Sequence, residues 1–165
     1  MTRVDFYISK DHGDNARLVI AARLAEKAVK QGLRVFIHST SENEATAMGT
    51  LLWAAKPASF LPHSLGDAEA EERIAIGWGQ EPVGHNQFLI NLAVNAPPFF
   101  SRFERVAEVV TQDAEALKRF EKQFLDSLAR DSQGNLVYLP ANAWRLERTI
   151  EDWPEIQFLQ TMEIN

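Results

Sequence analysis

The sequence predicts an α/β domain with a mostly parallel central sheet and helices on both faces. Short runs of β-branched and aromatic residues alternate along the chain with segments of helical periodicity. Strands that alternate with helices pair in parallel, and the connecting helices cover the sheet. The chain has 165 residues, of which 45% are hydrophobic and 24% charged, so it is long enough to bury the core of one such domain.

Strands and helices alternate in the first third of the chain. Ser41 is a candidate N-cap, and Glu44, three residues later, completes a capping box for the second helix. Gly32 is well placed to end the first helix. The expected elements are a strand at 4–8, a helix at 14–31, a strand at 33–38, and a helix that follows Ser41 and reaches residue 52 or 53.

The rest of the chain begins with a region rich in loops and then returns to strands and a long helix. The expected elements are strands at 73–78 and 87–93, one helical turn followed by a strand within 99–110, an amphipathic helix at 113–130 and a last strand at 135–139. No repeat or low-complexity tract divides residues 1–144. We therefore expect a single Rossmann-like, three-layer domain over 1–144, followed by an extension over 145–165.

Charge and composition argue against several classes of protein. The net charge of −6 disfavours non-specific nucleic-acid binding, which needs a basic surface. The sequence has no cysteine, so thiolate chemistry and disulfides are excluded. No apolar run approaches the ~18 residues of a membrane span, and an acid at position 5 interrupts the region where a signal peptide is apolar. A cytoplasmic protein is expected.

The turn after the first strand does not resemble a phosphate-binding loop. A dinucleotide site of the Rossmann type needs several glycines there, so that backbone N–H groups can approach the pyrophosphate. Residues 9–15 contain one glycine, Gly13, together with two acids, Asp11 and Asp14, which repel phosphate. The pair Gly77 and Gly79 favours a turn or bulge between two strands over a nucleotide fingerprint.

Metal sites and catalytic clusters are also not indicated. The four histidines are scattered and do not form the i, i+4 pair of zinc helices. Asp5, near Asp11 and Asp14, is interpreted as part of a solvated edge rather than of a carboxylate site. We expect no cofactor and no metal. A small α/β nucleotide-binding enzyme, with a pocket lined by Asp11, Ser39 and Ser41, stays open as an alternative.

The segment from residue 52 to residue 63 is the most unusual part of the sequence. It places Trp53 at the end of a helix and Phe60 seven residues later, with a proline-containing loop between them. Either both aromatic side chains fill the core of the domain, or they form an exposed patch of the kind that anchors protein–protein interfaces. The sequence pattern by itself leaves both interpretations open.

With these residues in place, the sequence resembles the chi-subunit family of bacterial DNA polymerase III. The 52–63 segment, Leu-Trp followed by Pro and then Ser-Phe-Leu-Pro-His, is the most specific feature. The supporting features are the opening strand at 4–7 with a helix that leads into Gly-Leu-Arg-Val at 32–35, and Phe-Glu-Arg-Val at 103–106 leading into a long helix. Together they cover residues 3 to about 144.

The resemblance implies an accessory subunit without bound nucleotide and without a catalytic site of its own, within a DNA-directed DNA polymerase (nucleotidyltransferase) holoenzyme. It implies that the psi subunit docks on this segment and connects the chain to the clamp loader during DNA replication. The implied psi-binding residues are Trp53, Pro57, Phe60, Leu61, Pro62 and His63. The same surface is expected to suit a repair helicase, which is the alternative partner.

The resemblance also implies a site for the acidic C-terminal tail of single-stranded DNA-binding protein on the helix at 113–130. Such a tail needs cations for its carboxylates and an apolar pocket for its end. Glu121 and Gln123 stand where the family pattern has arginines, so a solvated face with ion pairs is an open alternative. The residues that match this site are Lys118, Arg119, Lys122 and Phe124.

Residues 145–165 lie beyond the region of resemblance. They combine a net charge of −3 with apolar and aromatic residues. One interpretation is that this extension folds back over the 113–130 helix, or onto a neighbouring molecule, and covers the tail site. The other is an additional helix that packs on the domain's own core.

Overall fold

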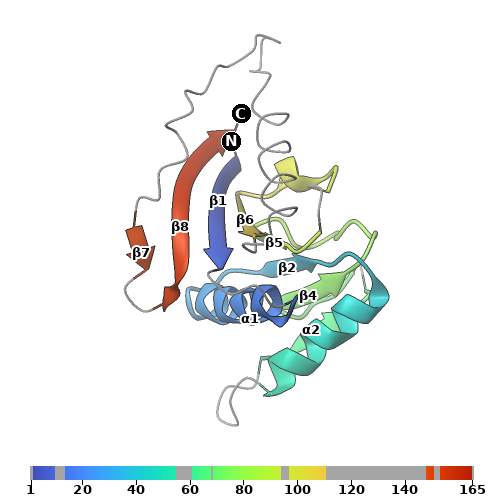
Figure 1. Ribbon diagram of the computed structural model, residues 1–165. Coiled ribbons are helices and arrows are strands. Elements are labelled where there is room, and N and C mark those ends of the chain that lie inside the picture. The colour runs from blue at the N-terminus through green and yellow to red at the C-terminus, as the bar shows by residue number, and fades with distance from the viewer. Residues whose placement is uncertain are drawn as a thin grey trace.

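A computed structural model gives the structure of the protein (Figure 1). The expected helix at 113–130 and the expected strand at 135–139 lie outside the described part of the chain. The residues that the structure describes are 2–9, 14–54, 61–67, 69–93, 97–110, 148–150 and 153–164.

The described residues form two α-helices, one 3₁₀ helix and eight strands. Between residues 2 and 110, every predicted helix and strand is present, with ends that differ by at most two residues, and one unpredicted strand, β3, is added. The elements are β1 (Thr2–Ser9), α1 (Asp14–Lys30), β2 (Val35–His38), α2 (Glu42–Ala54), β3 (His63–Leu65), β4 (Ile74–Gly77), β5 (Phe88–Asn91), η1 (Phe100–Arg102), β6 (Arg105–Val110), β7 (Arg148–Ile150) and β8 (Trp153–Ile164).

The strands form one sheet in the order β3-β4-β2-β5-β6-β1-β8-β7 (Figure 1). All neighbouring pairs from β3 to β1 are parallel, whereas β8 is antiparallel to β1 and β7 is antiparallel to β8. The α/β class with a mostly parallel sheet is therefore confirmed.

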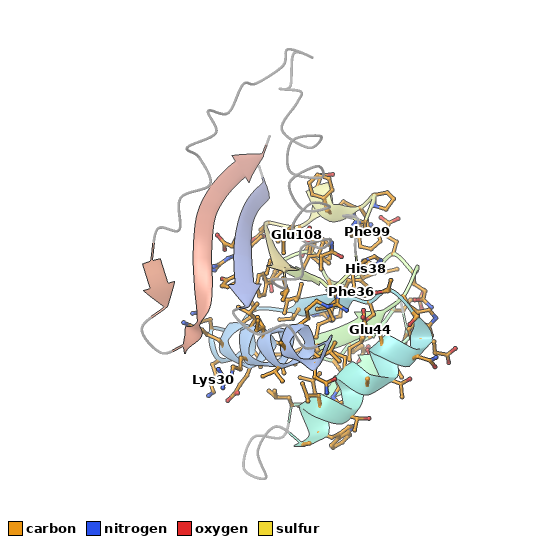
Figure 2. The ribbon with its side chains drawn as sticks, in the orientation of Figure 1. Lys30, Phe36, His38, Glu44, Phe99 and Glu108 are labelled. Atoms are coloured by element: carbon orange, nitrogen blue, oxygen red, sulfur yellow. The ribbon has the colours of Figure 1, made fainter. Side chains whose placement is uncertain are left out.

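Successive side chains along a strand point to opposite faces of the sheet. Val35 and Ile37 of β2 belong to the main core, which also contains the apolar faces of α1 and α2. Phe36 lies on the opposite face, where its ring is 5.9 Å from that of Phe99 and 6.3 Å from that of Phe103 (Figure 2). The described helices α1 and α2 thus pack on one face, and the segment that contains η1 packs on the other.

The amino-terminal end of α2 follows the predicted capping chemistry in part, because Glu44 bonds back to Thr40 rather than to the N–H of the N-cap Ser41. The Ser41 hydroxyl accepts a hydrogen bond from the Glu44 backbone N–H at 3.2 Å, and the Glu44 carboxylate accepts from the backbone N–H and the hydroxyl of Thr40. The other Glu44 oxygen accepts from Arg17 of α1, which also donates to the Leu92 carbonyl. One capping residue therefore joins α2 to α1 and to the end of β5.

Two glycines of the sequence motif at 77–79 have conformational and steric roles. Gly79 has a φ of 100°, which side-chain-bearing residues rarely adopt, and it lies in the turn after β4. At Gly77, an added Cβ would lie 2.7 Å from the Phe36 ring. Gly79 therefore serves a turn, as the sequence interpretation favoured, whereas Gly77 allows the close approach of the Phe36 ring.

The C-terminal extension contains strands where a helix was one of the expectations. That expectation is wrong for residues 148–150 and 153–164, because β8 pairs with β1 from Thr2↔Ile164 to Ser9↔Ile156. The alternation of a regular strand is not visible in this segment, because Gln160 interrupts the apolar even positions and the register of β8 on β1 shifts between Asp5 and Tyr7. The division at residue 144 and the covering of a tail site stay predictions.

Candidate protein-contact surface

Trp53 lies at the last turn of α2 with 61% of its surface exposed. The buried positions of this helix include Ala45, Met48 and Leu52, which face the sheet. Because successive helical residues are about 100° apart, the side chain after Leu52 leaves the buried face. The core-filling interpretation is therefore wrong for Trp53.

His63 at the start of β3 packs against Trp53. The two ring centroids are 5.3 Å apart in an edge-to-face arrangement. The His63 ring is held from two further sides, because its Nδ1 is 2.9 Å from the Leu61 carbonyl oxygen and it lies against Gly49 of α2. A Cβ at position 49 would meet His63 Nε2 at 3.3 Å. The Trp53 ring therefore rests on a fixed neighbour.

Leu65 extends this surface along β3 and is 43% exposed. His63 and Leu65 are two residues apart on the strand, and both side chains approach the same point of α2 at Gly49. We call Trp53, His63 and Leu65 together the Trp53 surface. It combines an aromatic ring, an imidazole and an aliphatic side chain at the β3 end of the sheet.

The other residues predicted for this surface have different positions. Leu61 is buried and supports His63 through its carbonyl, and Pro62 is exposed between them. Pro57 and Phe60 lie outside the described residues. Leu65 was not predicted, because the pattern of residues 63–65 does not indicate a strand.

The four residues predicted for the tail site, Lys118, Arg119, Lys122 and Phe124, lie outside the described residues. The pocket of the alternative enzyme hypothesis is described only in part. Ser41 caps α2, and Ser39 is buried just after β2. Asp11 lies outside the described residues.

Asp5 is a buried charge, so its interpretation as a solvated edge is wrong. Its side chain is fully buried and forms an ion pair with Arg105 of β6, the strand next to β1. The same guanidinium lies 5.5 Å from the centre of the Phe88 ring, and its Nη2 is 3.4 Å from the Tyr7 hydroxyl. The buried Asp5 carboxylate, which has lost its hydration, is thus paired with the guanidinium of Arg105, which lies 100 positions later in the sequence.

Three polar side chains form a row across the opposite face of the sheet, at the carboxyl ends of three parallel strands. His38, Asn91 and Glu108 are paired in register across β2, β5 and β6. Figure 2 labels His38 and Glu108. The Asn91 amide donates to both Glu108 carboxylate oxygens at 3.1 Å, and its carbonyl oxygen lies 3.0 Å from His38 Nδ1. Burial raises the pKa of Glu108 to about 8, although the Asn91 hydrogen bond opposes the shift.

The natural chain is expected to lose stability as the pH rises, and Glu108→Gln is expected to abolish this loss. Because the folded-state pKa of about 8 exceeds the ordinary 4.5, folding takes up a proton between these values. The free energy of unfolding of the natural chain should therefore fall by up to about 1.4 kcal/mol per pH unit in this range and level off above it. Urea unfolding from pH 5.5 to 8.5 measures the slope, and equal slopes for both proteins would contradict the assignment.

Within the described residues, the structure shows neither a metal-binding cluster nor a membrane-spanning helix. No group of three or more His, Asp or Glu side chains within the described ranges could hold a metal ion. Over the same ranges, no helix is long and apolar enough to cross a membrane.

The fold and the Trp53 surface define an α/β domain with a candidate protein-contact surface at one end of its sheet. Comparison with known proteins is more specific: the family model "DNA polymerase III chi subunit, HolC" matches residues 1–133. The chain belongs to this family. The strands β7 and β8 lie beyond the matched residues.

Two curated relatives carry the name DNA polymerase III subunit chi. The protein from Pseudomonas aeruginosa is 43% identical over 113 residues, which cover 68% of this chain and 80% of the relative. The protein from Haemophilus influenzae is 33% identical over 116 residues, with the same coverage of both chains. The resemblance drawn from the sequence is therefore confirmed.

Proposed function

We propose that this chain is an adaptor of the DNA polymerase III holoenzyme in the cytoplasm, and that its Trp53 surface docks the psi subunit of the clamp loader. The observation that carries this proposal is the 61% exposure of Trp53 on a chain of the chi family. An exposed tryptophan contributes little to the packing of the core, whereas tryptophan is among the side chains that contribute most binding energy to protein interfaces.

The geometry of the Trp53 surface favours a partner that brings apolar side chains. His63 fixes one edge of the Trp53 ring, so the ring loses little conformational freedom when a partner covers it. Leu65 offers a second apolar contact on the neighbouring strand. Phe60, seven residues after Trp53, is proposed as a further anchor, with Pro57 shaping the loop between them.

The second half of the proposed function is a link to single-stranded DNA-binding protein. Its acidic tail would bind the cations and the aromatic ring of the 113–130 segment, Lys118, Arg119, Lys122 and Phe124. The chain would thus contact nucleic acid only through a protein. A repair helicase that uses the Trp53 surface is the alternative partner, and it would compete with psi because both would cover the same side chains.

Direct binding of purified proteins tests the proposal. The chain is mixed with the psi subunit of the same organism, and complex formation is followed by gel filtration and calorimetry. A stoichiometric complex is expected. Failure to bind psi, together with binding to a helicase that Trp53→Ala abolishes, would replace psi by the alternative partner. Failure to bind either would overturn the docking function.

A further inference from the structure

The strand β3 forms one edge of the sheet. It is the first strand of the sheet order, and within the described part of the chain it pairs only with β4. An edge strand keeps a row of backbone N–H and C=O groups that no neighbouring strand uses. Natural edges are often protected by a lysine or a proline within the strand, and β3 contains neither. The edge of β3 is therefore suited to pair with a further strand.

The hydrogen bonds to β4 determine which backbone groups of β3 face outward. The Gly66 N–H donates to the Ile76 carbonyl at 2.8 Å, so the backbone N–H of Gly66 faces β4. The backbone groups of successive residues in a strand point to alternate sides. Those of Leu65 therefore face away from β4, and those of His63, two residues earlier, do the same. The two β3 residues of the Trp53 surface thus also carry the outward N–H and C=O groups.

The surroundings of this edge select the side chains of an added strand. The exposed Trp53 ring and the Leu65 side chain lie on the α2 side, and residues 45–54 of α2 include no charged residue. Beyond the carboxyl end of β3 follow two exposed acids, Asp67 and Glu69. The edge therefore complements an extended segment whose alternate side chains are apolar and whose end near Asp67 carries a lysine or an arginine.

We propose that the partner of the Trp53 surface adds such an extended segment to β3, so that the segment becomes the next strand of the sheet. Strand addition of this kind rests on the proposed function and specifies how the partner binds. The N–H and C=O groups of His63 and Leu65 bond to the added backbone, and its apolar side chains cover the Trp53 ring. Main-chain hydrogen bonds supply affinity in this mode, and the side-chain pattern supplies specificity. A partner helix that covered the edge would instead bury these backbone groups without hydrogen bonds, which costs free energy.

Amide hydrogen exchange of the full chain, free and in complex with the psi subunit of the same organism, tests this mode of binding. Heteronuclear NMR follows each amide. In the free chain the Leu65 amide should exchange rapidly because its N–H faces outward, whereas the Gly66 amide, which is bonded to Ile76, should exchange slowly. In the complex the amides of Leu65 and His63 should exchange at least a hundredfold more slowly. The Gly66 amide, protected in both states, is the internal reference.

Two variants at position 65 separate the backbone hydrogen bond from the side chain. Leu65→Pro removes the outward N–H, whereas Leu65→Ala removes most of the side chain and keeps the N–H. Proline is tolerated on an edge strand where its nitrogen faces away from the neighbouring strand, so pairing with β4 should persist. Leu65→Pro is expected to bind psi at least tenfold more weakly than Leu65→Ala. Thermal unfolding followed by circular dichroism checks that both variants fold, and the exchange measurement decides alone if Leu65→Pro does not.

The outcomes distinguish strand addition from the proposed function. If psi binds and Trp53→Ala weakens it, but the Leu65 amide exchanges as in the free chain, strand addition is overturned and psi docking stands. Equal affinities of folded Leu65→Pro and Leu65→Ala for psi would overturn strand addition in the same way. A Leu65 amide that is already protected in the free chain would mean that the chain itself or a second copy covers the edge, which also overturns it. If psi does not bind, psi docking is overturned and strand addition with it.

Discussion

Trp53→Ala is expected to weaken binding of the psi subunit at least thirtyfold and to leave the melting temperature unchanged within about 2 °C. Truncation of an interface tryptophan commonly costs about 2 kcal/mol or more of binding free energy, which corresponds to this factor. The effect on folding should be small, because 61% of the side chain is already in contact with solvent. Calorimetric titration gives the affinity, and thermal unfolding followed by circular dichroism gives the stability.

Val83→Ala is the matched control for this experiment. Val83 is 66% exposed, but it lies in the connection between β4 and β5 rather than on α2 or β3. Its truncation should leave affinity for psi within a factor of two. If Trp53→Ala also kept its affinity, the psi site would have to lie elsewhere on the chain. If Trp53→Ala lowered the melting temperature by 5 °C or more, the ring would be a structural residue despite its exposure.

The fold could be predicted where local chemistry determines it. Gly32 ends α1 with a φ of 81°, and the Leu33 N–H bonds back to the Ala28 carbonyl, which is the geometry that a helix-ending glycine allows. Ser41 as an N-cap, with Glu44 three residues later, could also be recognised in the sequence, because helix capping depends on residues that are close together in the chain. Short β3 was missed because three residues carry too little periodicity to reveal a strand that depends on its partner β4.

The candidate site was predictable only in part, because burial and pairing arise from tertiary structure. Trp53 stands out in the sequence, but its exposure depends on which face of α2 meets the sheet. Asp5 appeared to be a surface acid because its cation is 100 residues away on the neighbouring strand. Glu108 gave no signal either, since its raised pKa results from burial beside Asn91 of a different strand.

Arg105→Met is expected to destabilise the domain by about 3 kcal/mol or more. Asp5 is fully buried, and the substitution removes the guanidinium that contacts its carboxylate in the interior. Removal of one partner of a buried ion pair typically costs about 3–5 kcal/mol, because that partner no longer offsets the desolvation of the charge that remains. For a chain of 165 residues this corresponds to a fall of roughly 10 °C in melting temperature. Urea unfolding and differential scanning calorimetry measure the two quantities.

The double variant Asp5→Asn, Arg105→Met separates the charge effect from loss of packing. Once the carboxylate is neutral, no buried charge needs compensation, so the double variant should recover at least half of the stability that Arg105→Met loses. No recovery would mean that the contact of Arg105 with Phe88 and Tyr7 stabilises the β1–β6 junction and that the ion pair contributes little. Recovery would show that the Arg105 cation on β6 offsets the cost of burying the Asp5 carboxylate on β1.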